Sequence, residues 1–135
     1  MTWNDVRTAM RLMALTGHAW LGLIAFDVAR LGGFARLHDW IRRCRPNVRR
    51  RASSPTAEEV VWSIDEACVW YVKRVACLQR SAIATWLLRR HGFRAELVIA
   101  CRPLPFESHA WVELDGRIVN DRPQYQKVFT VLDRL

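Results

Sequence analysis

The sequence predicts an α+β protein in which several helices precede a small antiparallel sheet. Two observations support this prediction. Apolar residues recur at helical spacing as far as residue 91, and short apolar runs separated by Gly and Pro turn signals follow from residue 95. The chain has 135 residues, and 51% of them are hydrophobic. It is therefore expected to form a single domain, residues 1–135, with a core of its own.

Residues 1–52 are expected to form a helical layer that ends in a basic linker. Thr2 is the expected N-cap of the first helix, with Asp5 at the position that a glutamate takes in a capping box. Gly17 is expected to break or kink the helical pattern, and the pair Gly32-Gly33 is expected to end it. The predicted helices cover residues 3–15, 19–31 and 34–44.

The most apolar run of the chain, residues 12–26, lies within this layer. It is shorter than the roughly 20 residues that a membrane span needs, and Thr16, Gly17 and His18 interrupt it. A buried helix is therefore the preferred interpretation, and contact with a membrane is not expected.

Positive charge dominates the composition, with 21 Lys and Arg against 13 Asp and Glu and a formal net charge of +8. Much of it gathers in the linker, where Pro46 excludes a continuous helix. No aromatic residue interleaves these charges, as it does in proteins that bind single-stranded nucleic acid, so we interpret the linker as a solvated loop and expect no nucleic-acid partner. The candidate residues for docking a substrate or a partner protein are Arg42, Arg43, Arg49, Arg50 and Arg51.

Two further helices are expected after the linker. Thr56 and Glu59 fit a capping box, and an apolar stripe continues from there to a helix end near Val72. The next helix is predicted to begin at Cys77 and to end at His91-Gly92, with the glycine as its C-terminal cap.

The sheet is predicted from the last third of the chain. A strand is expected over residues 95–100, followed by a loop marked by two prolines. Residues 108–114 alternate, and Asp115-Gly116 turns the chain into residues 117–121, which is the signal of a β-hairpin. The tail, residues 125–135, is expected to close the domain as strand or loop.

The four cysteines do not form a metal site or a disulfide framework by their spacing. No pair fits C-x-x-C, and no histidine lies at metal-ligand spacing from them. Reduced thiols in a cytoplasmic protein are expected. No glycine-rich phosphate-binding motif is present, so no cofactor is expected. The cysteines are Cys44, Cys68, Cys77 and Cys101.

Cys77 is the one cysteine that the sequence gives a reason to be reactive. The free N–H groups and the dipole at a helix start favour a thiolate over a thiol, and Lys73, Arg74 and Arg80 add positive charge nearby. A cysteine taken alone is more often a small buried apolar residue. His109, at the start of a predicted strand, raises the weight of the catalytic interpretation because it could serve as the base.

A third group would have to orient the histidine, and the hairpin turn decides which residue that is. With a two-residue turn, Asn120 shares the face of His109 and Asp121 points to the other face. With a three-residue loop and a bulge, Asp121 lies directly opposite His109. The sequence leaves both alternatives open. The backbone N–H of Cys77 is the natural first donor of an oxyanion hole, and the second donor is not identified, with Gln79 and Trp70 as candidates.

Three motifs together resemble the C-terminal peptidase part of the lasso-peptide B proteins, which belong to the transglutaminase-like cysteine protease superfamily. The first is Cys-Leu-x-Arg-Ser at residues 77–81, and the second is Leu-Leu-Arg-Arg-x-Gly at residues 87–92. The third is Ser-His-Ala-Trp-Val-Glu at residues 108–113, followed by Gly116 and by Val-Asn-Asp at residues 119–121. The resemblance covers roughly residue 60 to the C-terminus.

The resemblance implies a transglutaminase- or papain-like core over residues 53–135, with the cysteine helix packed on a small antiparallel sheet. It implies Cys77 as nucleophile, His109 as general base and Asp121 as the orienting carboxylate. The implied reaction is hydrolysis of one amide bond, which removes the leader from a ribosomally made precursor peptide. The implied partners are that precursor, a separate leader-recognition protein whose domain this chain has no room for, and the ATP-dependent macrocyclase.

Two other functions compete with the peptidase. The same three residues would serve a transglutaminase-like acyl transferase that uses an amine in place of water. A non-catalytic basic binding protein with an inert Cys77 is the alternative from another class.

Overall fold

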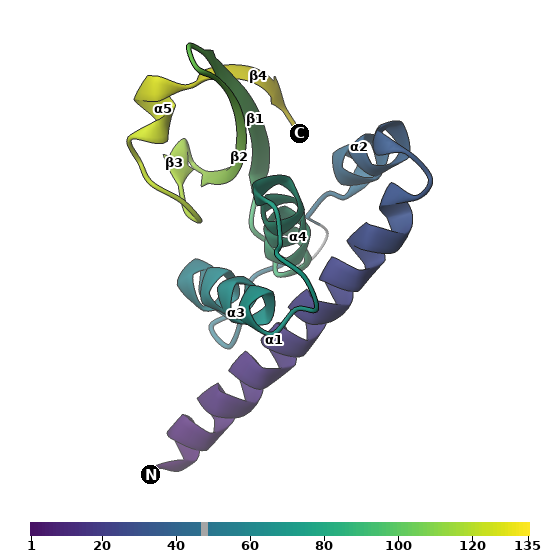
Figure 1. Ribbon diagram of the computed structural model, residues 1–135. Coiled ribbons are helices and arrows are strands. Elements are labelled where there is room, and N and C mark those ends of the chain that lie inside the picture. Colours follow the sequence, from purple (N-terminus) through teal and green to yellow (C-terminus); the bar gives the residue numbers. More distant parts are fainter. Residues whose placement is uncertain (47–48) are drawn as a thin grey trace.

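The computed structural model describes residues 1–46 and 49–135, and it confirms the predicted α+β class (Figure 1). Residues 47 and 48 of the predicted linker lie outside the described residues. The elements in chain order are α1 (Trp3–Arg30), α2 (Phe34–Arg43), α3 (Ala57–Val69), α4 (Cys77–Arg90), β1 (Glu96–Pro103), β2 (Phe106–Leu114), β3 (Arg117–Ile118), α5 (Tyr125–Val128) and β4 (Thr130–Arg134).

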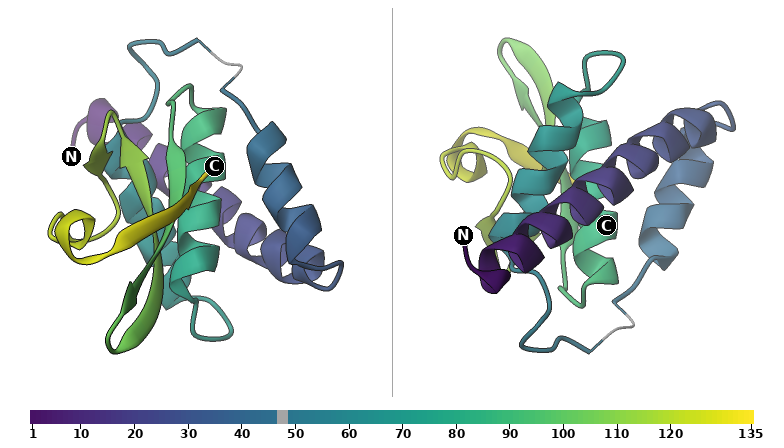
Figure 2. Two further views of the ribbon diagram at one scale, coloured as in Figure 1. Left: turned by 90° about the horizontal axis from the view of Figure 1, so that it is seen from above. Right: turned by 90° about the horizontal axis from the view of Figure 1, so that it is seen from below.

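Helix α4 is the central element, because it lies between the sheet and α1 (Figure 2). One side of α4 packs on β1 and β2, and the other packs on α1 and α3. Almost every residue between Ser81 and Arg89 is buried as a result. The start of α4, where Cys77 stands, is therefore held by both layers.

Helix α1 runs through Gly17 without the predicted break. Glycine inside a helix costs about 1 kcal/mol relative to alanine, and the burial of Leu15, Ala19 and Leu23 outweighs that cost. A Cβ built on Gly17 would meet nothing within 4 Å. Among the described residues, α1 alone is long and apolar enough to cross a membrane, although 28% of that apolar window is buried inside the protein.

Gly22 lies where α1 packs closely against α4. A Cβ at this position would come within 3.0 Å of Ile83 and 3.2 Å of Trp86, both on α4. The absence of a side chain therefore sets the distance between the helical layer and the central helix.

The sheet has the strand order β3-β2-β1-β4, and every pairing is antiparallel. The β1–β2 hairpin is longer than predicted, with pairs from Glu96 with Glu113 to Pro103 with Phe106. Pro103 therefore ends one strand, and Pro105 lies within the tight turn Leu104-Pro105. The tail is resolved into the short helix α5 and the edge strand β4.

The helix termini agree with the predicted caps. Thr2 with Asp5 and Thr56 with Glu59 form reciprocal capping boxes. Helix α3 ends at Val69, three residues before the predicted end, and Tyr71 of the following loop donates a hydrogen bond to Asp27 of α1 instead. Helix α4 begins at Cys77 as predicted and ends at Arg90, followed by Gly92 with a φ of 87°.

Candidate active site

His109 and Asp121 are in direct contact. His109 Nε2 lies 2.8 Å from Asp121 Oδ2, and both side chains are more than four fifths buried. The bond engages Nε2, and among the described residues Nδ1 makes no hydrogen bond to another protein atom. The imidazole is therefore anchored at one nitrogen and open at the other.

The hairpin turn has two residues, yet Asp121 reaches His109. Leu114 pairs with Arg117, and Asp115 and Gly116 both have positive φ angles, of 51° and 77°. Strand alternation after such a turn would put Asn120 on the face of His109. The alternation ends because β3 stops at Ile118 and the chain then bends toward His109.

Asn120, the alternative orienting residue, does not contact the imidazole. Its Oδ1 accepts a hydrogen bond from the backbone N–H of Val112 at 2.8 Å, and its Nδ2 donates to Ser81 Oγ at 3.0 Å. Asn120 is only 4% exposed. Its side chain thus provides the hydrogen-bond acceptor for β2 that a neighbouring strand would otherwise provide after β3 ends. It also joins β2 to α4.

Arg80 holds the segment that carries Asp121. Its Nη2 donates to the carbonyl oxygen of Asn120 at 2.6 Å, its Nε donates to Asp65 at 2.7 Å, and its Nη1 lies 4.0 Å from Asp121 Oδ2. A single guanidinium therefore connects α3 and α4 with the residues after β3, and it adds positive charge beside the Asp121 carboxylate.

Cys77 is the first residue of α4, and Ala76 before it offers no side-chain cap. The first N–H groups of the helix are therefore free of a side-chain acceptor. One turn later on the same helix face, Ser81 donates to the carbonyl oxygen of Ala110 at 3.0 Å. Ala110 follows His109 in β2, so Ser81 fixes the Cys77 end of α4 beside the strand of the histidine.

The far end of α4 gives the direction of the helix along the strand. Arg89 donates to the carbonyl oxygen of Ala95, and the next residue, Glu96, pairs with Glu113 of β2. Helix α4 therefore runs in the same direction as β2. One turn back from Ser81 is about 6 Å, so the start of α4 lies toward the residues of β2 that precede Ala110. Among the described residues, no hydrogen bond joins Cys77 to His109.

Aromatic rings enclose His109 on the side of the C-terminal segment. Tyr125 meets the imidazole edge to face with a centroid distance of 4.8 Å, and Phe129 and Trp111 lie at 5.7 and 6.2 Å. These rings restrict the rotation of the imidazole. Sequence reasoning assigned no role to these rings, and it predicted the tail that carries Tyr125 and Phe129 only as strand or loop.

Buried Glu113 holds the C-terminal segment that carries α5 and β4. It accepts hydrogen bonds from Trp111 at 2.9 Å, Gln126 at 3.0 Å and Arg134 at 2.8 Å. Burial alone would raise the pKa of Glu113, but these three donors outweigh it, and the pKa lies below its ordinary value. The carboxylate thus ties β2 to α5 and β4.

Neither candidate for the second oxyanion donor is free in this structure. Gln79 is 3% exposed and donates to the carbonyl oxygen of Leu23 on α1 at 3.0 Å. Trp70 donates to Glu66 of its own helix at 2.9 Å. Burial raises the pKa of Cys68, and Cys101 of β1 pairs with Ser108 of β2, the residue before His109. Within the described ranges, no three His, Cys, Asp or Glu side chains gather as metal ligands.

Two of the five arginines proposed for docking have partners within the protein, and their docking role stays a prediction. Arg50 donates to the carbonyl oxygens of Pro55 and His91 and lies 3.8 Å over the ring of Phe93, so it braces the linker against the end of α4. Arg42 lies 3.5 Å from Asp133 of β4. The remaining three are exposed: Arg43, Arg49 and Arg51.

Sequence reasoning missed the structural roles of Arg80, Ser81 and Asn120. Arg80 was noted only as a nearby positive charge, although it stands three residues after Cys77 in the Cys-Leu-x-Arg-Ser motif. The signal was the presence of two polar residues, Arg80 and Ser81, in a helix that is otherwise mostly apolar.

Comparisons with known proteins agree with this architecture. A family model described as the transglutaminase-like superfamily matches residues 21–134. The microcin J25-processing protein McjB of Escherichia coli is 38% identical over 56 residues, which are 42% of this chain and 27% of that protein. The match thus spans about a quarter of the relative's length. No solved structure matches the chain. Because the family model covers most of the chain, from within α1 to the end of β4, the chain belongs to the transglutaminase-like superfamily.

Proposed function

We propose that this chain is a lasso-peptide B protein that removes the leader from a precursor peptide by hydrolysing one amide bond. Its superfamily supports this proposal, and so does its partial similarity to a protein named for the processing of microcin J25. The observation that carries the chemistry is the 2.8 Å contact between His109 Nε2 and Asp121 Oδ2. It leaves Nδ1 as the nitrogen that can exchange a proton with a nucleophile.

In the first step, the thiol of Cys77 passes its proton to Nδ1 of His109, and the sulfur attacks the carbonyl carbon of the scissile amide. The carbonyl oxygen gains negative charge. The backbone N–H of Cys77, at the start of α4 where no side chain caps the helix, would donate to that oxygen.

In the second step, the C–N bond breaks and the imidazolium gives its proton to the departing amine, which is the new N-terminus of the core peptide. The leader stays attached to Cys77 as a thioester. His109 then takes a proton from water, the hydroxyl attacks the thioester, and the C–S bond breaks. The leader leaves with a free carboxylate, and the thiol of Cys77 is restored.

Asp121 acts through His109 in both steps. As a hydrogen-bond acceptor at Nε2, it keeps the proton on that nitrogen and leaves the Nδ1 lone pair available. It also stabilises the imidazolium that forms after proton transfer. Arg80 and the aromatic rings around His109 serve as positioning groups.

The proposal includes the partners that the family resemblance implies. A separate recognition protein would bind the leader and raise its effective concentration at this enzyme. An ATP-dependent macrocyclase would consume the freed core N-terminus. We place the reaction in the cytoplasm, where the Cys77 thiol would stay reduced.

The test is incubation of a leader–core precursor with the protein, with and without a leader-recognition protein, followed by mass spectrometry of the products. Cleavage should depend on Cys77 and His109, and the Cys77→Ala and His109→Ala variants should be inactive. The Cys101→Ala variant is the matched control and should remain active. Absence of cleavage by the wild-type protein in both conditions would contradict the peptidase.

The same experiment separates hydrolysis from acyl transfer. The leader product should carry a free carboxylate even when a primary amine is present in excess. A leader mass shifted by the added amine would instead identify an acyl transferase. Iodoacetamide at limiting concentration gives a readout that needs no precursor, because it should modify Cys77 before Cys68 or Cys101.

A further inference from the structure

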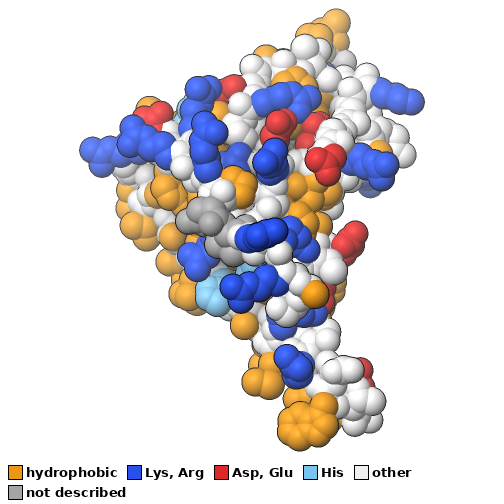
Figure 3. Space-filling model, turned by 180° about the vertical axis from the view of Figure 1, so that it is seen from behind, with side chains coloured by type: hydrophobic (Ala, Val, Ile, Leu, Met, Phe, Trp, Pro, Cys, Tyr) orange, Lys and Arg blue, Asp and Glu red, His pale blue; other side chains and the backbone are white. Residues whose placement is uncertain are grey.

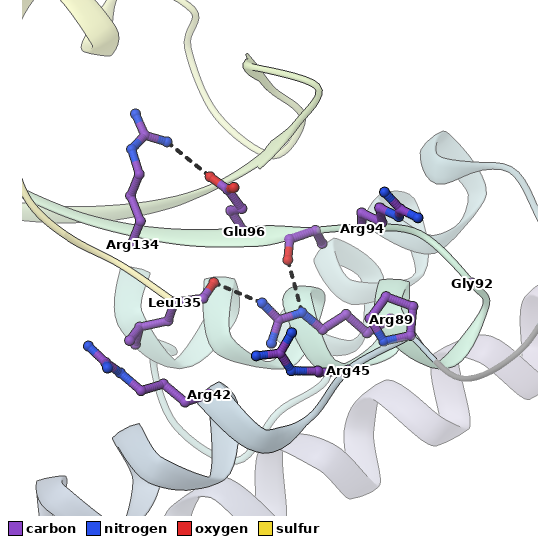
Figure 4. A pocket seen from close by; sticks show the side chains of 10 residues that line it. Arg42, Arg45, Arg89, Gly92, Arg94, Glu96, Arg134 and Leu135 are labelled. Atoms are coloured by element: carbon purple, nitrogen blue, oxygen red, sulfur yellow. Dashed lines mark hydrogen bonds and ion pairs between the residues drawn. The ribbon is translucent and has the colours of Figure 1, made fainter.

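Five arginines line a recess at the C-terminal end of α4, far from the candidate active site (Figure 4). The recess has a volume of about 790 Å³, and one acidic residue, Glu96, contributes to its lining. The face seen in Figure 3 carries many Lys and Arg side chains and fewer acidic ones. The arginines of the recess are Arg42, Arg45, Arg89, Arg94 and Arg134.

Arg89 is the most buried of these arginines, and all three of its side-chain nitrogens already donate within the protein. It is 7% exposed, and its guanidinium donates to four backbone oxygens at 2.6–2.9 Å. No Asp or Glu side chain in the described part of the chain bonds to it. Burial lowers the pKa of Arg89, which is the mark of a cation without sufficient counter-charge. The acceptors belong to Ile41, Cys44, Ala95 and Leu135.

Arg45 and Arg94 add two more charges without a carboxylate partner. Both are exposed, and neither makes an ion pair or a side-chain hydrogen bond within the described residues. The sequence has no acidic residue between Asp39 and Glu58 that could neutralise Arg45 locally. The positive charge around Arg45 therefore follows from the local sequence as well as from the fold.

The other two arginines of the recess already have carboxylate partners. Arg134 pairs with Glu113 at 2.8 Å and with Glu96 at 3.2 Å. Arg42 lies 3.5 Å from Asp133, which also binds His38 at 2.9 Å. Two exposed positive charges, those of Arg45 and Arg94, thus remain open to a ligand beside the buried charge of Arg89.

We propose that this recess binds side-chain carboxylates of an extended acidic peptide segment. Guanidinium groups pair with carboxylates through two parallel hydrogen bonds. Charges that are carried by separate segments around a recess of this size suit several carboxylates along a chain better than one compact anion. No aromatic residue lines the recess, whereas sites for single-stranded nucleic acid combine positive charge with stacking rings.

The recess is a binding site and not part of the catalytic centre. Arg89 stands twelve residues after Cys77 on α4, so the two ends are about 18 Å apart along the helix. A peptide side chain held in the recess is therefore too far from the sulfur to belong to the residue that is cleaved. Binding should proceed equally well in a protein without the Cys77 thiol, which separates this inference from the proposed function.

The test measures the fluorescence anisotropy of a labelled peptide of alternating glutamate and serine, in low salt, against the full chain. The wild-type protein and the Cys77→Ala variant should bind it equally. The double variant Arg45→Gln/Arg94→Gln should bind it about tenfold more weakly. The double variant Arg7→Gln/Arg36→Gln removes the same charge from exposed positions outside the recess and should bind like the wild type.

A matched peptide of glutamine and serine should show no binding that depends on the recess. Equal affinity of the two double variants for the glutamate peptide would overturn the inference, because net charge alone would then explain binding. A single-stranded oligonucleotide that binds more tightly than the peptide, with the same dependence on Arg45 and Arg94, would also overturn it. So would complete displacement of the peptide by low millimolar inorganic phosphate.

Discussion

Arg80 donates a hydrogen bond of 2.6 Å from Nη2 to the backbone carbonyl oxygen of Asn120, the residue immediately before Asp121. Because β3 ends at Ile118 and the last ladder-like bond is from Val119 to Val112, the guanidinium and the Asn120 side chain together hold the residues that follow. The position of the carboxylate that binds His109 thus depends on a side chain one turn into the helix that Cys77 begins. The nucleophile and the orienting group of the proposed triad are coupled through α4.

Replacement of Arg80 by methionine should lower kcat/KM for precursor cleavage roughly 10- to 100-fold, because Asp121 would no longer be held in place. Substitution of Arg80 by lysine cannot reproduce three contacts with one ammonium group and should restore only part of the activity. The pH profile of kcat/KM should also shift, since the environment of His109 changes. The exposed Arg117→Met variant is the control, and an equal loss of activity in it would contradict this role.

Two glycines of α1 should respond in opposite directions to substitution by alanine. Gly22→Ala should lower the free energy of unfolding by about 1–3 kcal/mol, since the new methyl group would press on Ile83 and Trp86. Gly17→Ala should raise it by about 0.5–1 kcal/mol, because the position is helical and open. Chemical denaturation of both variants measures the difference, and a destabilised Gly17→Ala protein would argue against a continuous helix.

The sequence was sufficient for the fold class, because its signals were local. Both capping boxes, the start of α4 at Cys77 and the turn at Asp115-Gly116 follow from residues within a few positions of one another. The helix boundary predicted at Gly17 was wrong, because burial against α3 and α4 decides that position and the local pattern does not show it.

The candidate site was harder to predict, because its geometry depends on contacts that the local sequence pattern does not show. The pairing of His109 with Asp121 depends on where β3 stops, and that point is fixed by long-range bonds from Asn120 to Val112 and Ser81. Strand alternation alone would have chosen Asn120. The roles of Arg80 and Arg89 rest on contacts with residues 40 or more positions away, which one sequence does not reveal.

Asn120→Ala should destabilise the fold by about 1–3 kcal/mol, because it leaves the buried N–H of Val112 without an acceptor. Asn120→Asp keeps the acceptor for Val112 but loses the donor to Ser81 and buries a charge, so it should not restore stability. Thermal unfolding of the two variants measures this effect. Wild-type stability in Asn120→Ala would show that the amide has no structural role.

Glu113 should make the protein sensitive to acid. Its folded-state pKa lies below the ordinary value of 4.5, so its contribution to stability is present above that pH and is lost as the pH falls through the lowered folded value.

Glu113→Gln should therefore be less stable than the wild type at neutral pH by about 1 kcal/mol or more, since the bond to Arg134 loses its charge. The difference between the two proteins should shrink as the pH falls below about 4.5, because the carboxylate of the unfolded wild-type chain then binds a proton before the folded one does. Urea denaturation at a series of pH values measures this difference, with the exposed Glu107→Gln variant as control. A difference that stayed constant from neutral to acidic pH would show that the charge of Glu113 does not stabilise the fold.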